Sequence, residues 1–390
     1  MKQADLVIVG GAIMGASVAY FLKHDLGFKG SVVVIEKDPT YTKSSTTLSA
    51  ASIRQQFSTP ENIALSQFGL KFISELKDRF GPEADIGFHE GGYLMLASEA
   101  GLPILQNNHT TQIAQGADID LMTPDRLKAR FPWLNVEDLA AGAFGTSGEG
   151  WFDAHMLLDL VRKGAIAAGA LFLKDEVVGL EKQNNKVTSV KLSSGDTIAC
   201  GAVVNCAGPA AASIASMLGI PLPIEARKRT VFVIDCKTPH PDMPLMVDTS
   251  GVYIRPEGNY FISGVCPSSE EDIPVGPDDL DPHYDLFEEM IWPSLYNRMP
   301  GFDAIKMVNA WAGHYEYCTL DQNAIIGAHP EISNFYFNAG YSGHGLQHAP
   351  GAGRAIGELF LFGEYRSLDA SIFGYERIVS QKPVREINVI

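Results

Sequence analysis

Cysteine is scarce in this sequence, and its spacing is not that of a metal site or a disulfide framework. Five cysteines occur in 390 residues, and no two of them are arranged as C-x-x-C. We therefore expect neither a zinc site nor any other metal in the protein. Reduced thiols are typical of a cytoplasmic protein, which is the localisation that we predict. The five are Cys200, Cys206, Cys236, Cys266 and Cys318.

Long apolar runs, an N-terminal leader and basic clusters are also missing. No stretch of about twenty apolar residues exists, so we expect no membrane-spanning helix. The first apolar strand begins at residue 5, so we expect no signal or transit peptide. Acidic side chains (46) outnumber basic ones (30), and the net charge is −16. Without a basic run, neither nucleic acid nor an anionic membrane surface is an expected partner.

The composition is that of a globular enzyme. Hydrophobic residues make up 46% of the chain and charged residues 19%, which excludes a disordered or fibrous protein. A chain of 390 residues is too long for one small core and suits two domains.

The first forty residues predict a βαβ unit that binds a dinucleotide. A buried strand at 5–9 is followed by Gly10-Gly11-Ala12-Ile13-Met14-Gly15, an apolar helix at 16–22 and a second apolar strand at 31–35. A glycine turn between strand and helix aims backbone N–H groups and the helix N-terminus at a pyrophosphate. Ala12 stands where the pattern has its middle glycine, so a small shift must accommodate the methyl group.

Glu36 ends the second strand and marks the ribose end of the predicted site. It follows Gly15 by 21 residues, where a carboxylate can accept hydrogen bonds from both ribose hydroxyls of an adenosine. A carboxylate here also disfavours a 2′-phosphate. The βαβ unit alone leaves open whether the dinucleotide is NAD or FAD.

The rest of the chain alternates parallel-sheet and antiparallel-sheet patterns. Apolar strands that run into glycine at 203–208 and 335–340 suit a parallel sheet, and alternating strands at 88–97 and within 229–264 suit an antiparallel one. Further strands are predicted at 170–173, 176–182 and 186–192, and helices after 59, at 104–116, after 123, at 151–168, at 210–218 and from 351. The expected fold class is α/β with an α+β unit, in two domains that share the chain discontinuously.

Three segments, in this order, give the chain a resemblance to a known family. They are the glycine turn of residues 7–15, Val203-Val204-Asn205-Cys206-Ala207-Gly208, and Asn338-Ala339-Gly340-Tyr341-Ser342-Gly343-His344-Gly345-Leu346. Arg227-Lys228-Arg229 and Trp311-Ala312-Gly313 are further matches. The chain resembles the D-amino-acid oxidase and sarcosine oxidase (DAO) family of FAD-dependent oxidoreductases over essentially its whole length.

The resemblance implies FAD as the cofactor and a Rossmann-like FAD-binding domain. That domain would comprise residues 1–82, 140–224 and 320–390, and an antiparallel-sheet substrate domain would comprise 83–139 and 225–319. Some sarcosine oxidases carry a flavin-linked cysteine near the position of His314. Because this residue is not a cysteine, we expect non-covalent FAD. Beyond the glycine turn and Glu36, the implied FAD contacts are Lys37, Ser45, Thr46, Val177, Ala207, Gly208, Gly340, Gly343, His344, Gly345 and Leu346.

The reaction that the resemblance implies is removal of hydride from a carbon next to an amine nitrogen, with transfer to flavin N5. Arg54 lies where sarcosine oxidases carry the arginine that holds the substrate carboxylate, a task suited to a planar guanidinium. His344 is the second catalytic candidate, since an imidazole titrating near neutrality suits proton traffic. A lysine of those enzymes is replaced by Gln347. The substrate-binding candidates are Arg54, Arg255, Tyr253, Gln347 and His314.

The implied partners are a small amine or amino-acid substrate and an electron acceptor, oxygen or another. Two alternatives stay open at this point. The resemblance extends to a member linked to assembly of a respiratory complex, so an FAD-containing assembly or interaction protein with a respiratory-chain partner is one. Oxidation of a 2-hydroxy acid is the other.

Overall fold

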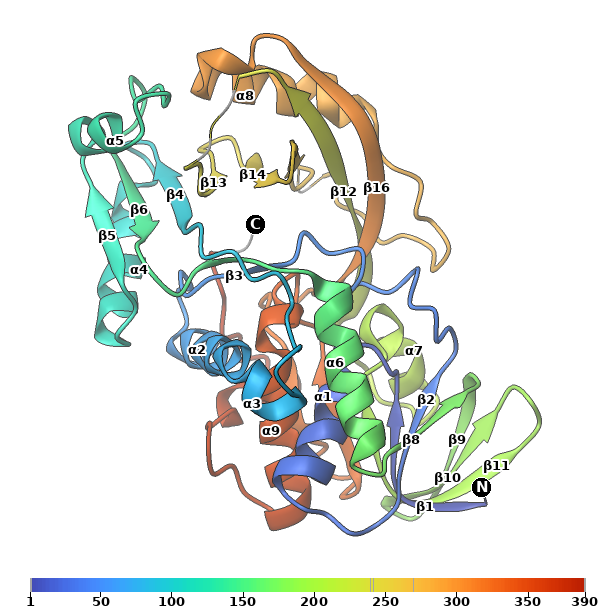
Figure 1. Cartoon of the computed structure of the whole chain (residues 1–390). Helices are drawn as coiled ribbons and strands as arrows, with labels where there is room; N and C mark the ends of the chain where they lie inside the picture. Colours follow the sequence, from blue (N-terminus) through green and yellow to red (C-terminus); the bar gives the residue numbers. More distant parts are fainter. Residues whose placement is uncertain (1, 239, 241, 269, 389–390) are drawn as a thin grey trace.

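Two large β-sheets with helices around them make up the structure (Figure 1). It is a computed structural model that describes residues 2–388 except 239, 241 and 269. The helix-covered parallel sheet occupies the lower half of Figure 1, and the second sheet arches above it. The predicted fold class, a Rossmann-like sheet joined to a second sheet domain, is confirmed.

The first sheet contains the predicted βαβ unit at its centre. Strand β1 pairs in parallel with β2 on one side and with β11 on the other. The main strand order is β17 (Ile325–Ala328), β18 (Phe335–Ala339), β11 (Thr197–Asn205), β1 (Gln3–Val9), β2 (Val32–Glu36) and β8 (Leu171–Lys174). The hairpin of β9 (Val177–Gln183) and β10 (Lys186–Leu192) joins the sheet through β10, which pairs with β11. Because β1, β2 and β11 are parallel, their carboxyl ends meet at one edge, where ligands of such sheets bind.

Helices cover both faces of this sheet. One face carries α1 (Ile13–Tyr20), α2 (Pro60–Ser74), α6 (Ala154–Ala167) and α9 (Gly345–Phe362), and the other carries α7 (Ala211–Ser216). A π-helical turn η1 (Phe21–Asp25) extends α1, and α3 (Leu76–Phe80) follows α2. The α1 and α9 backbones approach closely, since a Cβ on Gly353 would lie 2.6 Å from Cβ of Ser17.

Among the described residues the second sheet has eight strands, and β13 and β4 are its one parallel pair. Their order is β16 (Ile305–Cys318), β12 (Ile224–Cys236), β15 (Tyr260–Gly264), β14 (Tyr253–Glu257), β13 (Leu245–Val247), β4 (Tyr93–Ala97), β6 (Ala141–Gly145) and β5 (Ile119–Met122). Helices α5 (Pro124–Arg130) and α8 (Trp292–Arg298) pack on one face and α4 (Leu102–Ala114) on the other. A short two-stranded sheet, β3 (Ser52–Ile53) with β7 (Gly150–Trp151), stands apart from both.

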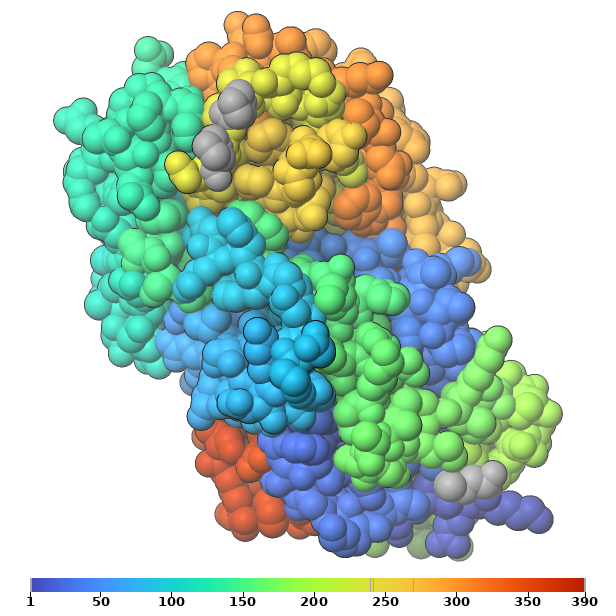
Figure 2. Space-filling view, viewed as in Figure 1, coloured from blue at the N-terminus to red at the C-terminus, as the bar shows by residue number. Residues whose placement is uncertain are grey.

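The remaining short elements lie around these sheets and helices. They are η2 (Gly208–Ala210), η3 (Phe287–Ile291), η4 (Pro300–Phe302), η5 (Ser371–Phe373) and α10 (Glu376–Val379). Among the described residues, no helix is long and apolar enough to cross a membrane. Figure 2 shows that side chains fill much of the front of the molecule between the two halves seen in Figure 1.

Several predicted element boundaries are wrong, and three of them have a clear physical reason. Helix α9 begins at Gly345 rather than at 351, although Pro350 lies inside it. Proline disfavours a helix interior, but residues 346–353 are buried, and their packing outweighs the lost hydrogen bond. Helix α6 begins at Ala154, because Asp153 caps it by accepting Met156 N–H at 2.9 Å. The strand expected at 88–97 is only Tyr93–Ala97, since Gly92 has a φ of +80°.

Six strands and two helices of the described residues lie where no element was predicted: β3, β5, β6, β13, β16 and β17, and α8 and α10. Strand β6 lies in the segment predicted to belong to the FAD-binding domain, yet it pairs with β4 and β5 in the second sheet. The boundary predicted near residue 140 therefore cuts the chain before a strand of the second sheet. The other domain boundaries stay a prediction.

Candidate active site

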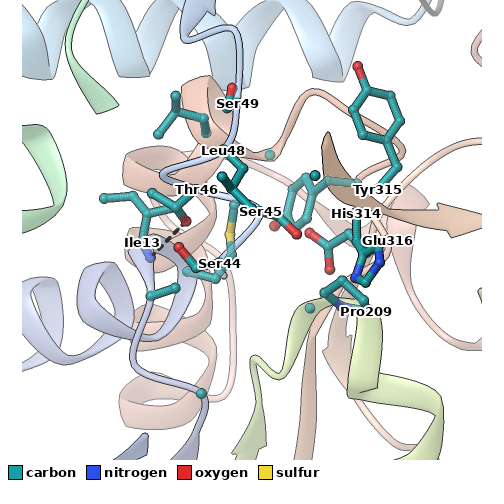
Figure 3. A pocket seen from close by; sticks show the side chains of 18 of the residues that line it. Ile13, Ser44, Ser45, Thr46, Leu48, Ser49, Pro209, His314, Tyr315 and Glu316 are labelled. Carbon is teal, nitrogen blue, oxygen red and sulfur yellow. Dashed lines mark hydrogen bonds between the residues drawn. The ribbon is translucent and has the colours of Figure 1, made fainter. Parts of the chain in front are cut away.

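A cavity of about 550 Å³ extends from the turn after β1 to the second sheet. Its walls come from segments far apart in sequence, and Figure 3 shows part of them. In that view one wall is formed by Ser44, Ser45, Leu48 and Ser49, and the facing wall by Pro209, His314 and Glu316. The Tyr315 side chain points away from this second wall. The segments that supply the lining are 9–14, 35–54, 175–177, 206–214, 224–231, 313–316 and 341–347, with Tyr93, Leu245, Tyr253 and residues 275–278.

The β1 end of the cavity offers unpartnered donors. Helix α1 has no side-chain cap and no acidic residue in its first turn, so its positive end is not neutralised by its own sequence. Ile13 N–H makes a long hydrogen bond of 3.4 Å to Thr46 Oγ1, drawn in Figure 3. The buried Ser45 Oγ has no hydrogen-bond partner among the described residues. Such an arrangement suits an anion, as the glycine turn predicted.

Glu36 braces the glycine turn as well as lining the cavity. Its carboxylate accepts Gly11 N–H at 2.8 Å and Asp38 N–H at 2.9 Å, and burial raises its pKa. Each oxygen accepts one backbone bond and keeps a lone pair for a ribose hydroxyl. Glu36 thus links the shape of the turn to the ribose end of the site.

Three predicted cofactor contacts lie behind the lining instead of in it: Gly11, Gly15 and Gly340. Close packing explains the second of them, because a Cβ on Gly15 would lie 1.9 Å from Gly10 O. Gly340 N–H donates to the Glu316 carboxylate at 2.9 Å. The other predicted contacts do line the cavity, namely Gly10, Ala12, Ile13, Met14, Glu36, Lys37, Ser45, Thr46, Val177, Ala207, Gly208, Gly343, His344, Gly345 and Leu346.

Arg54 lies buried at the second-sheet end, with 4% of its surface exposed. Its guanidinium donates to Gln56 O and, at 2.5 Å, to Asn388 O. The guanidinium carbon lies 4.0 Å from the centre of the Phe57 ring. Among the described residues no carboxylate lies within ion-pair distance of Arg54, although the buried carboxyls of Glu149 and Glu386 lie near enough for its charge to favour their ionised forms.

Gln347 supports the Arg54 backbone, which differs from the substrate contact predicted for it. Its Oε1 accepts Arg54 N–H at 2.8 Å and the Ser66 hydroxyl at 2.9 Å. Gln347 still lines the cavity. In the structure Gln347 therefore holds the Arg54 backbone in position relative to the turn of residues 341–347.

His344 lines the cavity with a buried Nε2 that has no hydrogen-bond partner among the described residues. Its ring packs against Phe57 and His348. Burial lowers its pKa to about 3. The expectation that His344 titrates near neutrality is therefore wrong: the ring is neutral at physiological pH and serves as a hydrogen-bond partner.

The other three substrate candidates differ in whether they line the cavity. Arg255 is absent from the cavity lining, since its guanidinium donates to Ala50 O at 2.9 Å and to Pro256 O at 2.9 Å and pairs with Glu257. The prediction that Arg255 contacts the substrate is therefore not supported. Tyr253 and His314 both line the cavity, and His314 Nε2 lies 2.7 Å from Asp279 O.

The cavity residues that sequence reasoning missed include Tyr93, Arg229 and Glu316. Tyr315 packs against Gly343 in the turn of residues 341–347, since a Cβ on Gly343 would lie 2.4 Å from Tyr315 Cε2. Burial raises the pKa of Glu316 to about 7. The signal for Arg229 was its place in the Arg227-Lys228-Arg229 match, but only the pairing of β12 and β16 brings it beside Tyr315.

The Rossmann-like sheet and the cavity at its edge suit a dinucleotide, and the comparisons with known proteins specify the class of protein. A family model described as FAD dependent oxidoreductase (DAO) matches residues 5–359. This chain belongs to that family, whose cofactor is FAD.

Named relatives agree with this assignment. FAD-dependent oxidoreductase domain-containing protein 1 of Xenopus laevis is 39% identical over 427 residues, covering 100% of this chain and 85% of that protein. Human mitochondrial dimethylglycine dehydrogenase is 25% identical, covering 93% of this chain and 43% of that protein. The crystal structure of L-proline dehydrogenase from P. horikoshii superposes with a TM-score of 0.85 at 26% identity, covering 97% of this chain and 98% of that one.

The residues of the cavity fit FAD. Gly10 has a φ of +95°, and a Cβ there would lie 2.3 Å from Cys206 O, so only glycine brings the backbone so near the nucleotide site. The uncapped α1 and the free Ser45 hydroxyl suit the pyrophosphate. Glu36 suits the ribose, and the turn of residues 341–347 suits the flavin.

Replacing Glu36 with alanine should weaken FAD binding by about tenfold or more, because a charge-assisted ribose bond and the brace of Gly11 are lost together. The measurement is the FAD dissociation constant of deflavinated protein titrated with FAD. Glu181→Ala is the control, since Glu181 pairs with Lys191 on the surface of the same sheet. Equal FAD affinity in the two variants would show that Glu36 does not contribute to FAD binding.

Glu316→Gln should change how stability depends on pH. The folded state keeps the Glu316 proton up to a pKa of about 7, whereas the ordinary value is 4.5. The unfolded chain therefore loses this proton first, and stability falls as pH rises through that window, by up to about 3 kcal/mol. Glutamine still accepts Gly340 N–H and should flatten this slope, which melting curves across pH measure. Exposed Glu331→Gln is the control, and an unchanged slope in Glu316→Gln would refute the assignment.

Proposed function

We propose that this protein oxidises the C–N bond of an amino acid or N-alkyl amine that carries a carboxylate. The observation that carries the proposal is Arg54, a buried guanidinium that lines the cavity and has no ion-pair partner among the described residues. A buried charge with no carboxylate in direct contact is costly, so binding an anion there is favourable. Backbone carbonyls and the Phe57 ring hold the side chain in place before the anion arrives.

His344 would act on the amine end of the same substrate. The amine has to be neutral for hydride to leave the adjacent carbon, and a neutral imidazole can accept a hydrogen bond from its N–H. The low pKa of His344, caused by burial, keeps Nε2 able to accept in this way. A cationic imidazole would be repelled by the positive charge of Arg54, which also favours the neutral form of His344. Bound FAD supplies the two-electron acceptor at N5.

Tyr93, Tyr253 and Tyr315 would wall the substrate in. All three line the cavity, and burial raises the pKa of each phenol. They therefore stay neutral and present rings and hydroxyls to the substrate without adding negative charge beside Arg54. Similarity to dimethylglycine dehydrogenase and L-proline dehydrogenase, whose names specify oxidation of amines with a carboxylate, supports this substrate class.

An anaerobic reduction screen tests the proposal. The FAD-loaded protein is mixed with amino acids, N-methyl amino acids, amines without a carboxylate, and 2-hydroxy acids, and loss of the flavin absorption band is followed. We expect bleaching by an amine that carries a carboxylate and none by its decarboxylated counterpart. Bleaching by 2-hydroxy acids alone would replace the proposal with alcohol oxidation. An unreactive flavin with every class would favour the assembly or interaction role.

The electron acceptor is a separate part of the proposal, oxygen or another oxidant. Re-oxidation of the reduced protein by air, compared with re-oxidation by a soluble quinone, distinguishes an oxidase from a dehydrogenase.

A further inference from the structure

A second arginine lines the same end of the cavity as Arg54. Arg229 lies on β12, with 9% of its surface exposed. Its guanidinium carbon lies 4.8 Å from the centre of the Tyr315 ring. Tyr315 also feels the charge of Arg54, so the two guanidinium groups act on one tyrosine that rests on Gly343. Both cations therefore face the region where a substrate beside the flavin turn would lie.

Arg229 differs from Arg54 in already holding a carboxylate. Its Nη1 and Nη2 donate to the two oxygens of Asp272 at 2.6 and 2.8 Å, a bidentate pair. Its buried Nε has no hydrogen-bond partner among the described residues. The guanidinium thus has the geometry that recognises a carboxylate, and it is not saturated by the one it holds.

Asp272 belongs to an acidic segment, residues 270–283, that covers part of the cavity wall. Val275, Pro277 and Asp278 of this segment line the cavity. The segment is held by Lys228, which pairs with Asp279 at 2.6 Å, and by Lys43, which pairs with Asp278 at 3.2 Å. Together with the hydrogen bond from Val275 N–H to Ala226 O at 2.9 Å, these contacts hold the segment independently of the Asp272–Arg229 pair.

We propose that Arg229 is a second anion subsite, held by Asp272 until a carboxylate of the substrate takes its place. The substrate class that follows is an amine with two acidic groups, one bound by Arg54 and the other by Arg229. This inference rests on the proposed function for the role of Arg54. Exchange of one carboxylate for another keeps the buried guanidinium paired throughout, so the protein never bears the cost of an unpaired Arg229.

Binding of non-oxidisable anions tests the subsite. FAD-loaded protein is titrated with acetate, malonate and succinate, and the shift of the flavin spectrum gives each dissociation constant. We expect at least one dicarboxylate to bind more tightly than acetate. Arg229→Gln should weaken that dicarboxylate by about tenfold and leave acetate unchanged. Asp272→Asn should tighten it severalfold, because the internal competitor has lost its charge.

Matched controls separate this effect from general damage. Arg227→Gln alters the same strand at a residue that does not line the cavity, and Glu271→Gln alters the exposed neighbour of Asp272. Arg229→Lys keeps the charge but not the bidentate geometry, and should lie between wild type and Arg229→Gln. Melting temperatures identify any variant that fails to fold.

The outcomes distinguish this inference from the proposed function. Equal binding of acetate and dicarboxylates, or equal loss of both in Arg229→Gln, overturns the subsite. No tightening in a folded Asp272→Asn overturns the exchange. If dicarboxylates bind as expected but no amine reduces the flavin, the subsite stands and the proposed function fails.

Discussion

Arg54→Lys should bind carboxylates about a hundredfold more weakly than the wild-type protein while keeping its FAD. Lysine preserves the charge but cannot form the planar, two-point contact that a guanidinium offers a carboxylate. It would also lose the hydrogen bonds to Gln56 O and Asn388 O and the Phe57 ring contact that fix the side chain. The measurement is the dissociation constant of acetate and of a reactive N-methyl amino acid, read from the flavin spectrum.

Arg79→Lys is the matched control for this substitution. Arg79 pairs with Asp25 and Glu75, far from the cavity lining, so its replacement should leave anion binding unchanged. If Arg54→Lys binds acetate as tightly as wild type, the guanidinium is not the anchor. The proposed substrate class would then lose its main support.

Glu386→Ala should lower the stability of the protein by about 3 kcal/mol and weaken anion binding as well. The Glu386 side chain is fully buried and accepts Ser58 N–H at 2.8 Å, Ser58 Oγ–H at 2.6 Å, Thr59 N–H at 3.1 Å and Asn62 Nδ2–H at 2.9 Å. These donors lie at the start of α2, where a carboxylate is also favoured by the helix dipole. Without it, buried donors lose their partners.

The effect on anion binding follows from the same segment. Asn388, two residues further along, supplies the carbonyl that accepts from Arg54. Releasing the C-terminal segment should therefore loosen Arg54 along with the start of α2. Thermal melting and acetate titration measure the two effects, and Glu376→Ala, at an exposed position of α10, is the control. A variant that melts like the control would contradict this account of the segment.

The pH dependence of Glu386 has the opposite sign to that of Glu316. Hydrogen bonds from Ser58 and Asn62 outweigh burial and lower its pKa. A carboxyl whose pKa is lowered on folding contributes stability above its ordinary pKa, and the contribution is lost as pH falls through the folded value. Acid should therefore release the C-terminal segment from α2.

A feature of this structure can be predicted from the sequence when the residues that determine it lie close together in the chain. The glycine turn could be predicted because Gly15 packs against Gly10 within one βαβ unit, and the Glu36 carboxylate contacts Gly11 of the same turn. The start of α9 could not, because Pro350 argues locally for a later start while burial against α1 and α2 decides otherwise. Local chemistry predicts the cofactor end of the site well.

The substrate end is harder because its residues meet only through the pairing of distant strands. Arg229 and Tyr315 lie 86 positions apart and are adjacent only because β12 and β16 pair antiparallel along their length. Strand β16 itself was not predicted. The pKa of His344 could not be foreseen either, since it depends on burial against Phe57 from a distant segment as well as against His348 of the adjoining helix α9.

The most direct test of the proposed function is single-turnover reduction of the FAD-loaded protein with a reactive amine deuterated at the carbon next to nitrogen. If hydride leaves that carbon, the flavin should bleach several times more slowly with the deuterated amine than with the ordinary one. Decarboxylated substrate should not bleach it at all. Bleaching at equal rates with both isotopologues, or no bleaching by any amine that carries a carboxylate, would contradict the account.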